Sequence, residues 1–319
     1  MTRQPRGEDG NAGGDLDVTE SLVVRGKGLR TVVENALGDP AIPGNGGRLF
    51  HVDQHGEGGV DVAFEHLTLA RGDVGCTGAR CSTGGSAIEQ HGSGALRFPA
   101  CRVPRNGASC TGEECGGTFD GTPIHTLFGG ALTVRKTRIK SSHVRCASDS
   151  CTLGAAAIAM ATDGGVPLSP AATASSGALE MTRVTIAENV ASCEGNGCSA
   201  GRVVGVFAES VAVQRLVVAS NELRCSGDGC AVRALVDRYA QGSALIDGAE
   251  LTDNLGDCVG EAASWMPRCR SAASRQRCAP RACSVIARPA RASRASSRCA
   301  TASAADPWRR ERSRSPTTW

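Results

Sequence analysis

The sequence contains few aromatic side chains. They make up 3% of the 319 residues, and before residue 260 there are six Phe, one Tyr and no Trp. A groove that stacks sugars on aromatic rings therefore has few candidates. Hydrophobic residues make up 40% of the chain, which is enough for a core, but that core must consist mainly of aliphatic side chains.

Long apolar runs are missing as well. No run approaches the length that a membrane-spanning helix needs, so we expect no transmembrane segment in this chain. The opening residues, MTRQPRGEDGNAGG, lack an apolar stretch after their basic residues and do not form a signal peptide. We expect residues 1–14 to be a disordered N-terminal segment and the start of the protein to have been placed too late.

Glycine is absent from the end of the chain. All 41 glycines lie at or before Gly260, whereas residues 261–319 contain 13 Arg, no Lys and three acids. That segment carries about +10, and subtracting this from the net +3 leaves −7 for residues 1–260. We interpret residues 261–319 as a disordered Arg/Ala/Ser-rich tail. Translation out of frame after a frameshift near codon 260 is the preferred origin, and an ordinary disordered tail or a basic arm that binds a polyanion are the alternatives.

What the sequence does contain is a repeat defined by fixed offsets. An aliphatic residue, which we call the anchor, precedes a cysteine by seven positions in six copies. The six anchor and cysteine pairs are Leu69 and Cys76, Val103 and Cys110, Ile139 and Cys146, Ile186 and Cys193, Val218 and Cys225, and Leu251 and Cys258. The period is about 33 residues, with one insertion around residues 166–177, and such periods indicate a solenoid.

Two further positions repeat with the anchor. A second cysteine follows the first by five positions in five copies, giving the pairs Cys76/Cys81, Cys110/Cys115, Cys146/Cys151, Cys193/Cys198 and Cys225/Cys230. In the sixth copy this position is Ala263. Three positions after the anchor stand Asn106, Asn189, Asn221 and Asn254, with Ser142 and Gly72 in the other copies. We expect these asparagines to form the turns of the coils, because their amides tolerate left-handed backbone angles and can form hydrogen-bonded ladders between stacked coils.

The apolar pattern of each copy is that of β-strands. The runs into the anchors, such as AVQRLVV and ALTVRKTRI, alternate between apolar and polar residues, and a second apolar run follows each cysteine loop. We therefore predict an all-β fold for residues 15–260, a parallel β-helix. Its core would be a stack of aliphatic side chains between coils about 4.8 Å apart.

The 16 cysteines indicate an oxidising compartment, because reduced cytosolic chains rarely carry so many outside metal sites. In CEGNGC and CSGDGC, the Asn196-Gly197 and Asp228-Gly229 steps are tight-turn signals that bring the flanking cysteines face to face. We favour a disulfide within each loop. Pairing between equivalent cysteines on adjacent coils stays open, because the coil spacing of about 4.8 Å also lies in the disulfide range.

Several segments resemble known β-helix proteins. Residues 21–36 (SLVVRGKGLRTVVENA), 47–52 and 60–72 resemble the opening coils of bacterial right-handed parallel β-helix proteins. The elements GGSAI and GAAAI, together with Ile186-x-x-Asn189 and its equivalents, are similar to the Gly-Gly-Ala-Ile and aromatic-x-x-Asn repeats of polymorphic outer-membrane proteins, with an aliphatic residue in place of the aromatic one. The resemblance covers residues 15–258. It implies that the β-helix is a right-handed, single-stranded, pectate-lyase-like solenoid, and it implies a secreted or surface location, often with an adhesive role.

Catalytic and metal-binding patterns find little support. Arg138-Ile139-Lys140 matches a tripeptide of polygalacturonase active sites, but the adjacent aspartate pair and the Asn-Thr-Asp of those enzymes do not occur, and Ile139 is a repeat anchor. The acids are scattered. The histidines show neither zinc-ligand spacing nor a common repeat position; they are His51, His55, His66, His91, His125 and His143. We therefore expect no catalytic, cofactor-binding or metal site.

The predicted function is that of a non-catalytic scaffold, secreted or associated with the outer membrane, which binds an unknown protein or glycan at the cell surface as an adhesin-like monomer and does not bind nucleic acid. A polysaccharide lyase or glycoside hydrolase on the same fold is the alternative, and convergence of acidic and basic side chains on one face of adjacent coils would favour it. A protein that binds a metal through its cysteine pairs is a third functional class.

Overall fold

The computed structural model describes residues 15–35, 47–53, 59–77, 84–112, 118–119, 121–127, 130–160, 177–232, 236–240, 243–260, 264–265 and 295–298. Its regular elements over these residues are all β-strands. The prediction of an all-β fold is thus confirmed. Outside the described residues lie Cys81, Cys115, residues 1–14, residues 166–176 of the insertion and most of the predicted tail.

The strands form three sheets. Sheet A stacks β1 (Leu16–Val18), β4 (Phe50–Val52), β8 (Ile88–Gln90), β13 (Ile124–Thr126), β17 (Thr152–Met160), β20 (Ser199–Ala208), β23 (Ala231–Val232) and β28 (Ser264–Trp265), with β12 (Thr118–Phe119) beside β17 and β24 (Val236–Ala240) beside β20. Sheet B has two arms. The first arm consists of β2 (Leu22–Arg25), β5 (Val62–Glu65), β9 (Ala95–Pro99), β14 (Ala131–Arg135) and β25 (Ala244–Asp247), and the second of β3 (Val32–Glu34), β6 (Thr68–Ala70), β10 (Arg102–Pro104), β15 (Arg138–Lys140) and β26 (Glu250–Thr252). The long strands β18 (Ala178–Ala187) and β21 (Ser210–Ala219) span both arms. Sheet C stacks β7 (Asp73–Thr77), β11 (Gly107–Thr111), β16 (His143–Ala147), β19 (Val190–Glu194), β22 (Glu222–Ser226), β27 (Leu255–Val259) and β29 (Ala295–Arg298).

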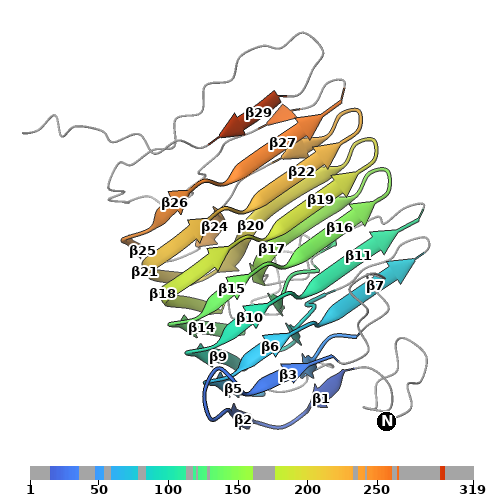
Figure 1. Cartoon of the computed structure of the whole chain (residues 1–319). Coiled ribbons are helices and arrows are strands. Elements are labelled where there is room, and N and C mark those ends of the chain that lie inside the picture. The colour runs from blue at the N-terminus through green and yellow to red at the C-terminus, as the bar shows by residue number, and fades with distance from the viewer. Residues whose placement is uncertain are drawn as a thin grey trace, which may run out of the picture.

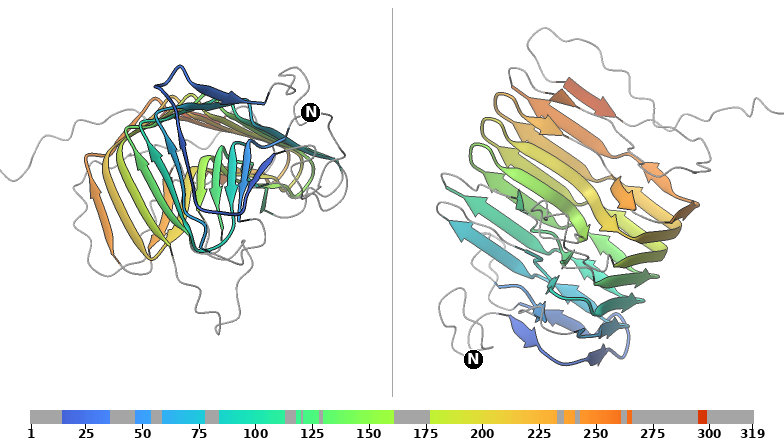
Figure 2. Two further views of the ribbon diagram at one scale, coloured as in Figure 1. Left: turned by 90° about the horizontal axis from the view of Figure 1, so that it is seen from below. Right: turned by 180° about the vertical axis from the view of Figure 1, so that it is seen from behind.

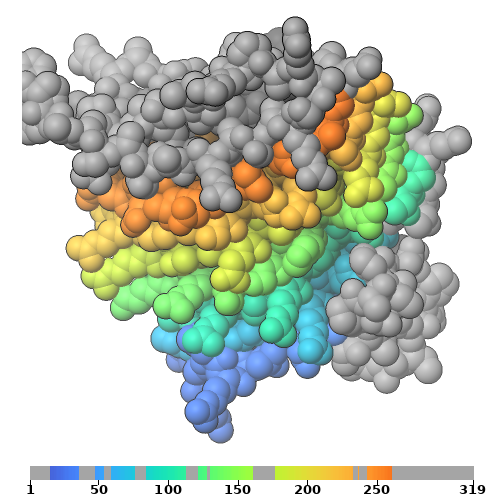
Figure 3. Space-filling view, turned by 45° about the horizontal axis from the view of Figure 1, so that its top comes forward, coloured from blue at the N-terminus to red at the C-terminus, as the bar shows by residue number. Residues whose placement is uncertain are grey.

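The strands stack into a parallel β-solenoid of about five turns (Figures 1 and 2). Within a turn the chain runs from sheet A through the two arms of sheet B to sheet C, and then enters sheet A of the next coil. Successive coils appear as stepped bands of colour in the space-filling view (Figure 3). Among the described strands, β29 is the only one that pairs in the antiparallel sense, against β27.

The anchors form one continuous ladder inside the solenoid. Val103, Ile139, Ile186 and Val218 pair in register across the second arm of sheet B, and each is fully buried. Burial of one such side chain contributes about 2 kcal/mol. The flanking residues Arg138 and Lys140 are exposed. The Arg-Ile-Lys tripeptide is therefore one strand of the repeat, as its place at the anchor predicts.

The buried asparagines form the predicted ladder beside the anchors. The Oδ1 atom of Asn221 accepts hydrogen bonds from the backbone N–H (3.0 Å) and the side-chain amide (2.9 Å) of Asn189. Asn254 accepts the same two bonds from Asn221, and Asn106 accepts one from the backbone N–H of Gly72. Each amide thus holds the corner of its own coil to an adjacent coil by hydrogen bonds.

The left-handed backbone angle at this corner belongs to the preceding residue, not to the asparagine. The residues with φ between 51° and 59° are Arg71, Arg105, Ser141, Glu188, Ser220 and Asp253, each directly before the repeat position. The expectation that the asparagines themselves adopt this angle is wrong. The reason is that the preceding residue, which is exposed or half-buried, makes the bend. The amide is thereby left inside the coil, where only a short polar side chain fits and finds partners.

The first cysteines of the copies form a ladder on sheet C. Cys76, Cys110, Cys146, Cys193, Cys225 and Cys258 stand in register on successive strands. Disulfides join Cys146 to Cys151 and Cys193 to Cys198, with Cα–Cα distances of 6.5 and 6.1 Å. Cys110 is also disulfide-bonded. The sulfurs belong to the core cluster, so each bond closes the corner between sheets C and A from within.

The tight turns between the paired cysteines depend on glycine. Gly197 and Gly229 have φ of 66° and 67°, and Gly195 and Gly227 have φ of 143° and 125°. A Cβ on Gly227 would lie 2.1 Å from the carbonyl oxygen of Gly195 on the coil before it. Glycine is therefore required both for the backbone angle and for the close approach of stacked loops.

Candidate functional site

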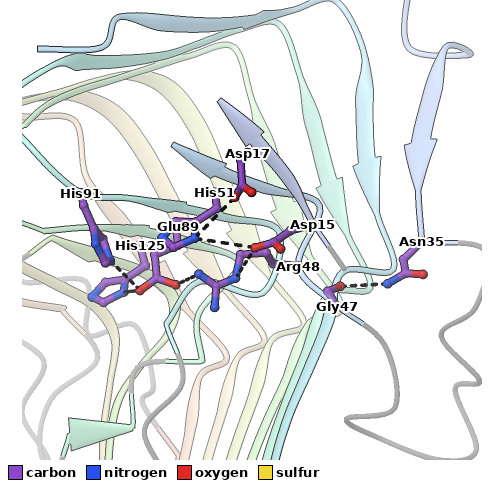
Figure 4. Close-up of polar contacts among 9 residues, drawn as sticks. All are labelled: Asp15, Asp17, Asn35, Gly47, Arg48, His51, Glu89, His91 and His125. Carbon is purple, nitrogen blue, oxygen red and sulfur yellow. Dashed lines mark hydrogen bonds and ion pairs between the residues drawn. The ribbon is translucent and has the colours of Figure 1, made fainter. Parts of the chain in front are cut away.

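A group of ionisable side chains gathers on the outer face of sheet A, over the first four coils (Figure 4). Phe50 and Ile88 point into the core, so the residues that follow them, His51 and Glu89, point to the opposite face. In register, Asp17 pairs with His51, His51 with Glu89, and Glu89 with His125. Four coils thus place four ionisable residues in one column.

Three more residues join this column. Asp15 precedes β1, Arg48 precedes β4 and His91 follows β8. We call the whole set the sheet A cluster; its members are Asp15, Asp17, Arg48, His51, Glu89, His91 and His125. Their side chains are between 4% and 22% exposed, although they lie on the outer face. For comparison, the side chains of Arg135 and Glu180, an ion pair elsewhere on the solenoid, are 55% and 40% exposed.

Glu89 lies at the centre of the cluster. Its Oε1 atom accepts a hydrogen bond from Nε2 of His91 at 3.1 Å and lies 3.8 Å from Nδ1 of His125. Its Oε2 atom accepts from the guanidinium of Arg48. Gly84 lies directly over this carboxylate, and a Cβ there would overlap with it.

Arg48 and His51 connect Glu89 to the two aspartates. The Nε atom of Arg48 lies 3.1 Å from Oδ2 of Asp15, so the guanidinium bridges Asp15 and Glu89. The Nδ1 atom of His51 lies 3.8 Å from Asp15 and 3.9 Å from Asp17. The rings of His51 and His91 meet edge to face, with centroids 4.9 Å apart. The cluster is therefore one connected network.

Burial and charge act in opposite directions on the two carboxyl groups that Arg48 joins. Burial by itself raises the pKa of Glu89, but the imidazoles of His125 and His91 and the charge of Arg48 together hold that pKa well below its usual range. For Asp15, burial outweighs the attraction of Arg48, and its pKa is raised. Glu89 is thus a fixed anion, whereas Asp15 takes up a proton more readily.

The charge of the cluster favours a cation over an anion. Three carboxylates stand against one guanidinium, which leaves a formal charge of −2 when the imidazoles are neutral. An anionic polysaccharide would meet net repulsion here. Imidazole nitrogens and carboxylate oxygens are, in contrast, common ligands of divalent metals.

The sequence prediction of scattered acids and unrelated histidines is wrong for this region. His51 and His125 occupy the same column of sheet A, with Glu89 between them. A signal for this column was available in the sequence, because Asp17, His51, Glu89 and His125 are spaced 34, 38 and 36 residues apart, close to the repeat period. The anchor and cysteine offsets do not reveal it, because varying loop lengths separate sheet A from them. His66 and His143 are exposed and lie elsewhere, and His55 is outside the described residues.

A second group of side chains is made of sulfur. The Sγ atoms of Cys225, Cys230 and Cys258 lie within 4.8 Å of one another, and Cys225 and Cys230 are thiols in the structure. The pKa of Cys258 is lowered to about 7, chiefly by its hydrogen bond with Cys225, and the pKa of Cys225 is raised by the same bond and by burial. The predicted loop disulfide between Cys225 and Cys230 is therefore in competition with pairing to Cys258 on the next coil.

Among the described residues, no helix has the length and apolar character that crossing a bilayer requires. No family model, curated protein or solved structure matches the chain in the comparisons.

Proposed function

We propose that this chain is a secreted or outer-membrane-associated β-helix scaffold that acts without catalysis at the cell surface, in an adhesin-like role. We also propose that its coils are of the repeat type of polymorphic outer-membrane proteins. The observation that carries the proposal is the set of disulfides in successive coils, Cys146–Cys151 and Cys193–Cys198. Such bonds form and persist in oxidising compartments and are rare in the cytosol.

The outer faces of sheets B and C supply the surface that such a scaffold would present. They carry exposed ion pairs between neighbouring coils, including Arg135 with Glu180 (2.7 Å), Arg145 with Glu194 (3.1 Å) and Lys140 with Glu188 (3.6 Å). Exposed pairs of this kind contribute little stability. A repeated array of them offers regularly spaced charged groups to a protein or glycan, and its mixed signs give no attraction for nucleic acid.

The proposal is tested by labelling intact cells that produce the full chain. A membrane-impermeant amine reagent should label the protein, and thiols trapped with iodoacetamide before lysis should leave the Cys146–Cys151 and Cys193–Cys198 peptides linked. A chain with Cys146 and Cys151 both changed to Ser should lose only the first linked peptide. Alkylation of all four cysteines in intact cells, together with absence of the amine label, would refute the proposal.

A polysaccharide lyase or glycoside hydrolase is a second candidate, and the sheet A cluster is the observation that favours it. Acids and an arginine converge there on adjacent coils, and Glu89 and Asp15 have pKa values shifted in opposite directions, which is typical of a base and an acid that act together. The charge of the cluster directs this candidate toward neutral glycans. Release of reducing ends from such glycans, and its loss in Glu89→Gln but not in His143→Ala, would support it.

A further inference from the structure

We propose that His51, Glu89 and His91 bind a divalent transition metal of the Zn²⁺ class, a site that lies beyond the scaffold role proposed above. Each residue offers one ligand atom, and these three atoms lie within 4.8 Å of one another. They come from β4, from β8 and from the residue directly after β8, so the backbone pairing of two adjacent coils fixes their relative positions.

The distances suit a small ion with short bonds. Metal–ligand bonds of about 2.0–2.1 Å in a tetrahedral site place neighbouring ligand atoms roughly 3.4 Å apart. Nε2 of His91 and Oε1 of Glu89 are already 3.1 Å apart. The metal would replace the hydrogen bond between them. The ligand atom of His51 lies within 4.8 Å of the other two, and small changes in its side-chain torsion angles would complete the triad.

In two of the three ligands, His51 and Glu89, the polar atom that would not bind the metal contacts a charged partner. Partners of this kind orient the ligands of known metal sites. Nδ1 of His51 faces the carboxylates of Asp15 and Asp17, which directs its Nε2 toward a metal. Oε2 of Glu89 is held by Arg48, which leaves Oε1 directed at His91. Carboxylate–histidine–metal arrangements of this kind fix the ring orientation and raise the basicity of the ligand nitrogen.

Charge and ligand type select the ion. A divalent cation would cancel the formal −2 of the sheet A cluster. Two imidazoles with one carboxylate suit Zn²⁺, Fe²⁺, Co²⁺ or Ni²⁺, whereas Ca²⁺ and Mg²⁺ require mainly oxygen ligands. A fourth position would be taken by water or by His125, whose Nδ1 lies 3.8 Å from Oε1 of Glu89.

The test is a calorimetric titration of the full chain with Zn²⁺ after treatment with a chelator. We expect one site whose affinity falls by at least about 100-fold in His91→Ala, because a direct ligand is lost, and by about tenfold in Asp17→Asn, because only the orientation of His51 is weakened. His143→Ala is the matched control, since this histidine is exposed on sheet C and should leave binding unchanged. Circular dichroism of each variant checks that the solenoid is intact.

Cobalt distinguishes this site from the thiols of Cys225, Cys230 and Cys258. Co²⁺ bound by nitrogen and oxygen should give visible d–d bands without the near-ultraviolet charge-transfer band of thiolate ligation, and the bands should disappear in His91→Ala. A thiolate band that disappears in Cys225→Ser, or Zn²⁺ affinity that is equal in the parent chain, His51→Ala and His91→Ala, would overturn the proposal. Full displacement of Zn²⁺ by equimolar Ca²⁺ would do the same.

Discussion

Single buried polar residues set the corners of this solenoid. Asn106, Asn189, Asn221 and Asn254 are at most 2% exposed, and their amides pair with backbone groups of their own coil and of the neighbouring coils. A polar group buried without partners destabilises a fold, whereas one with all its hydrogen bonds formed fixes a unique geometry. The asparagine ladder therefore defines where each coil bends and how it stacks.

Replacement of Asn221 by Ala should destabilise the solenoid markedly. The change removes the acceptor for two donors of Asn189 and leaves both of them buried, which costs roughly 2–3 kcal/mol. The measurement is the midpoint of urea unfolding without reductant. Asn196→Ala is the control, because Asn196 is exposed and its side chain accepts a single hydrogen bond, from the backbone N–H of Asp228. The expected loss there is about 0.5 kcal/mol or less. Equal midpoints for the two variants would show that the ladder adds no stability.

Residue type alone did not locate the sheet A cluster. In the sequence, Glu89, His51 and His125 are separate polar residues, each directly after an apolar residue of a short strand. Only the stacking of β4, β8 and β13 places them in one column. The anchors and first cysteines were identified correctly because their offset of seven residues lies within a single copy.

Whole elements decide how the cysteines pair. The last two coils bring three sulfurs together, from Cys225 and Cys258 on β22 and β27 and from Cys230 in the loop after β22, and only two of them can join in one disulfide. While Cys225 is a thiol, its hydrogen bond lowers the pKa of Cys258 to about 7. Cys258 is then the thiolate of the three sulfurs near neutral pH, and the thiolate is the form that is oxidised.

A Cys230→Ser variant should therefore form a disulfide between Cys225 and Cys258 under air oxidation. Their Cα atoms are direct partners in a parallel pair, where the spacing of about 4.8 Å lies within the disulfide range. Peptide mapping by mass spectrometry without reduction should detect this linked pair. In the parent chain we expect Cys225–Cys230 and Cys225–Cys258 forms together. Recovery of Cys225 and Cys258 as alkylated thiols in the variant would contradict this expectation.

At the scale of the whole molecule, each coil contacts mainly its two neighbours. Ladders of anchors, asparagines and cysteines continue from coil to coil with the same register, so the stability of the solenoid is a sum of coil and interface contributions. A deletion within the strands keeps these ladders in register only if it removes a complete coil, whereas loop lengths vary from coil to coil. A shift of one residue would turn core side chains outward.

Deletion of residues 187–218, one complete coil of 32 residues, should yield a folded and shorter solenoid. The deletion joins Ile186 to Ala219, which already pairs with Ala187, so the following strands keep their faces. A deletion of residues 187–217 is the matched control, because it displaces the following strands by one residue and exposes their core face. We expect a cooperative thermal transition and a monomeric elution volume for the first variant, and aggregation for the second. Similar behaviour of the two variants would argue against strict register.

The sequence by itself determined the architecture, because the same pattern of residues occurs in several copies of the repeat. Alternating runs specified strands, the anchors specified the core column, and the asparagine and cysteine positions specified two corners; all of these depend on residues close together in the chain. Only the tertiary structure decided that the residue before each asparagine makes the bend, that the disulfide sulfurs lie inside the coil, and that three sulfurs meet at Cys225. It also placed Asp17, His51, Glu89 and His125 in one column. These outcomes depend on distances between coils. Loop lengths and side-chain directions determine those distances, and a single copy of the repeat does not contain them.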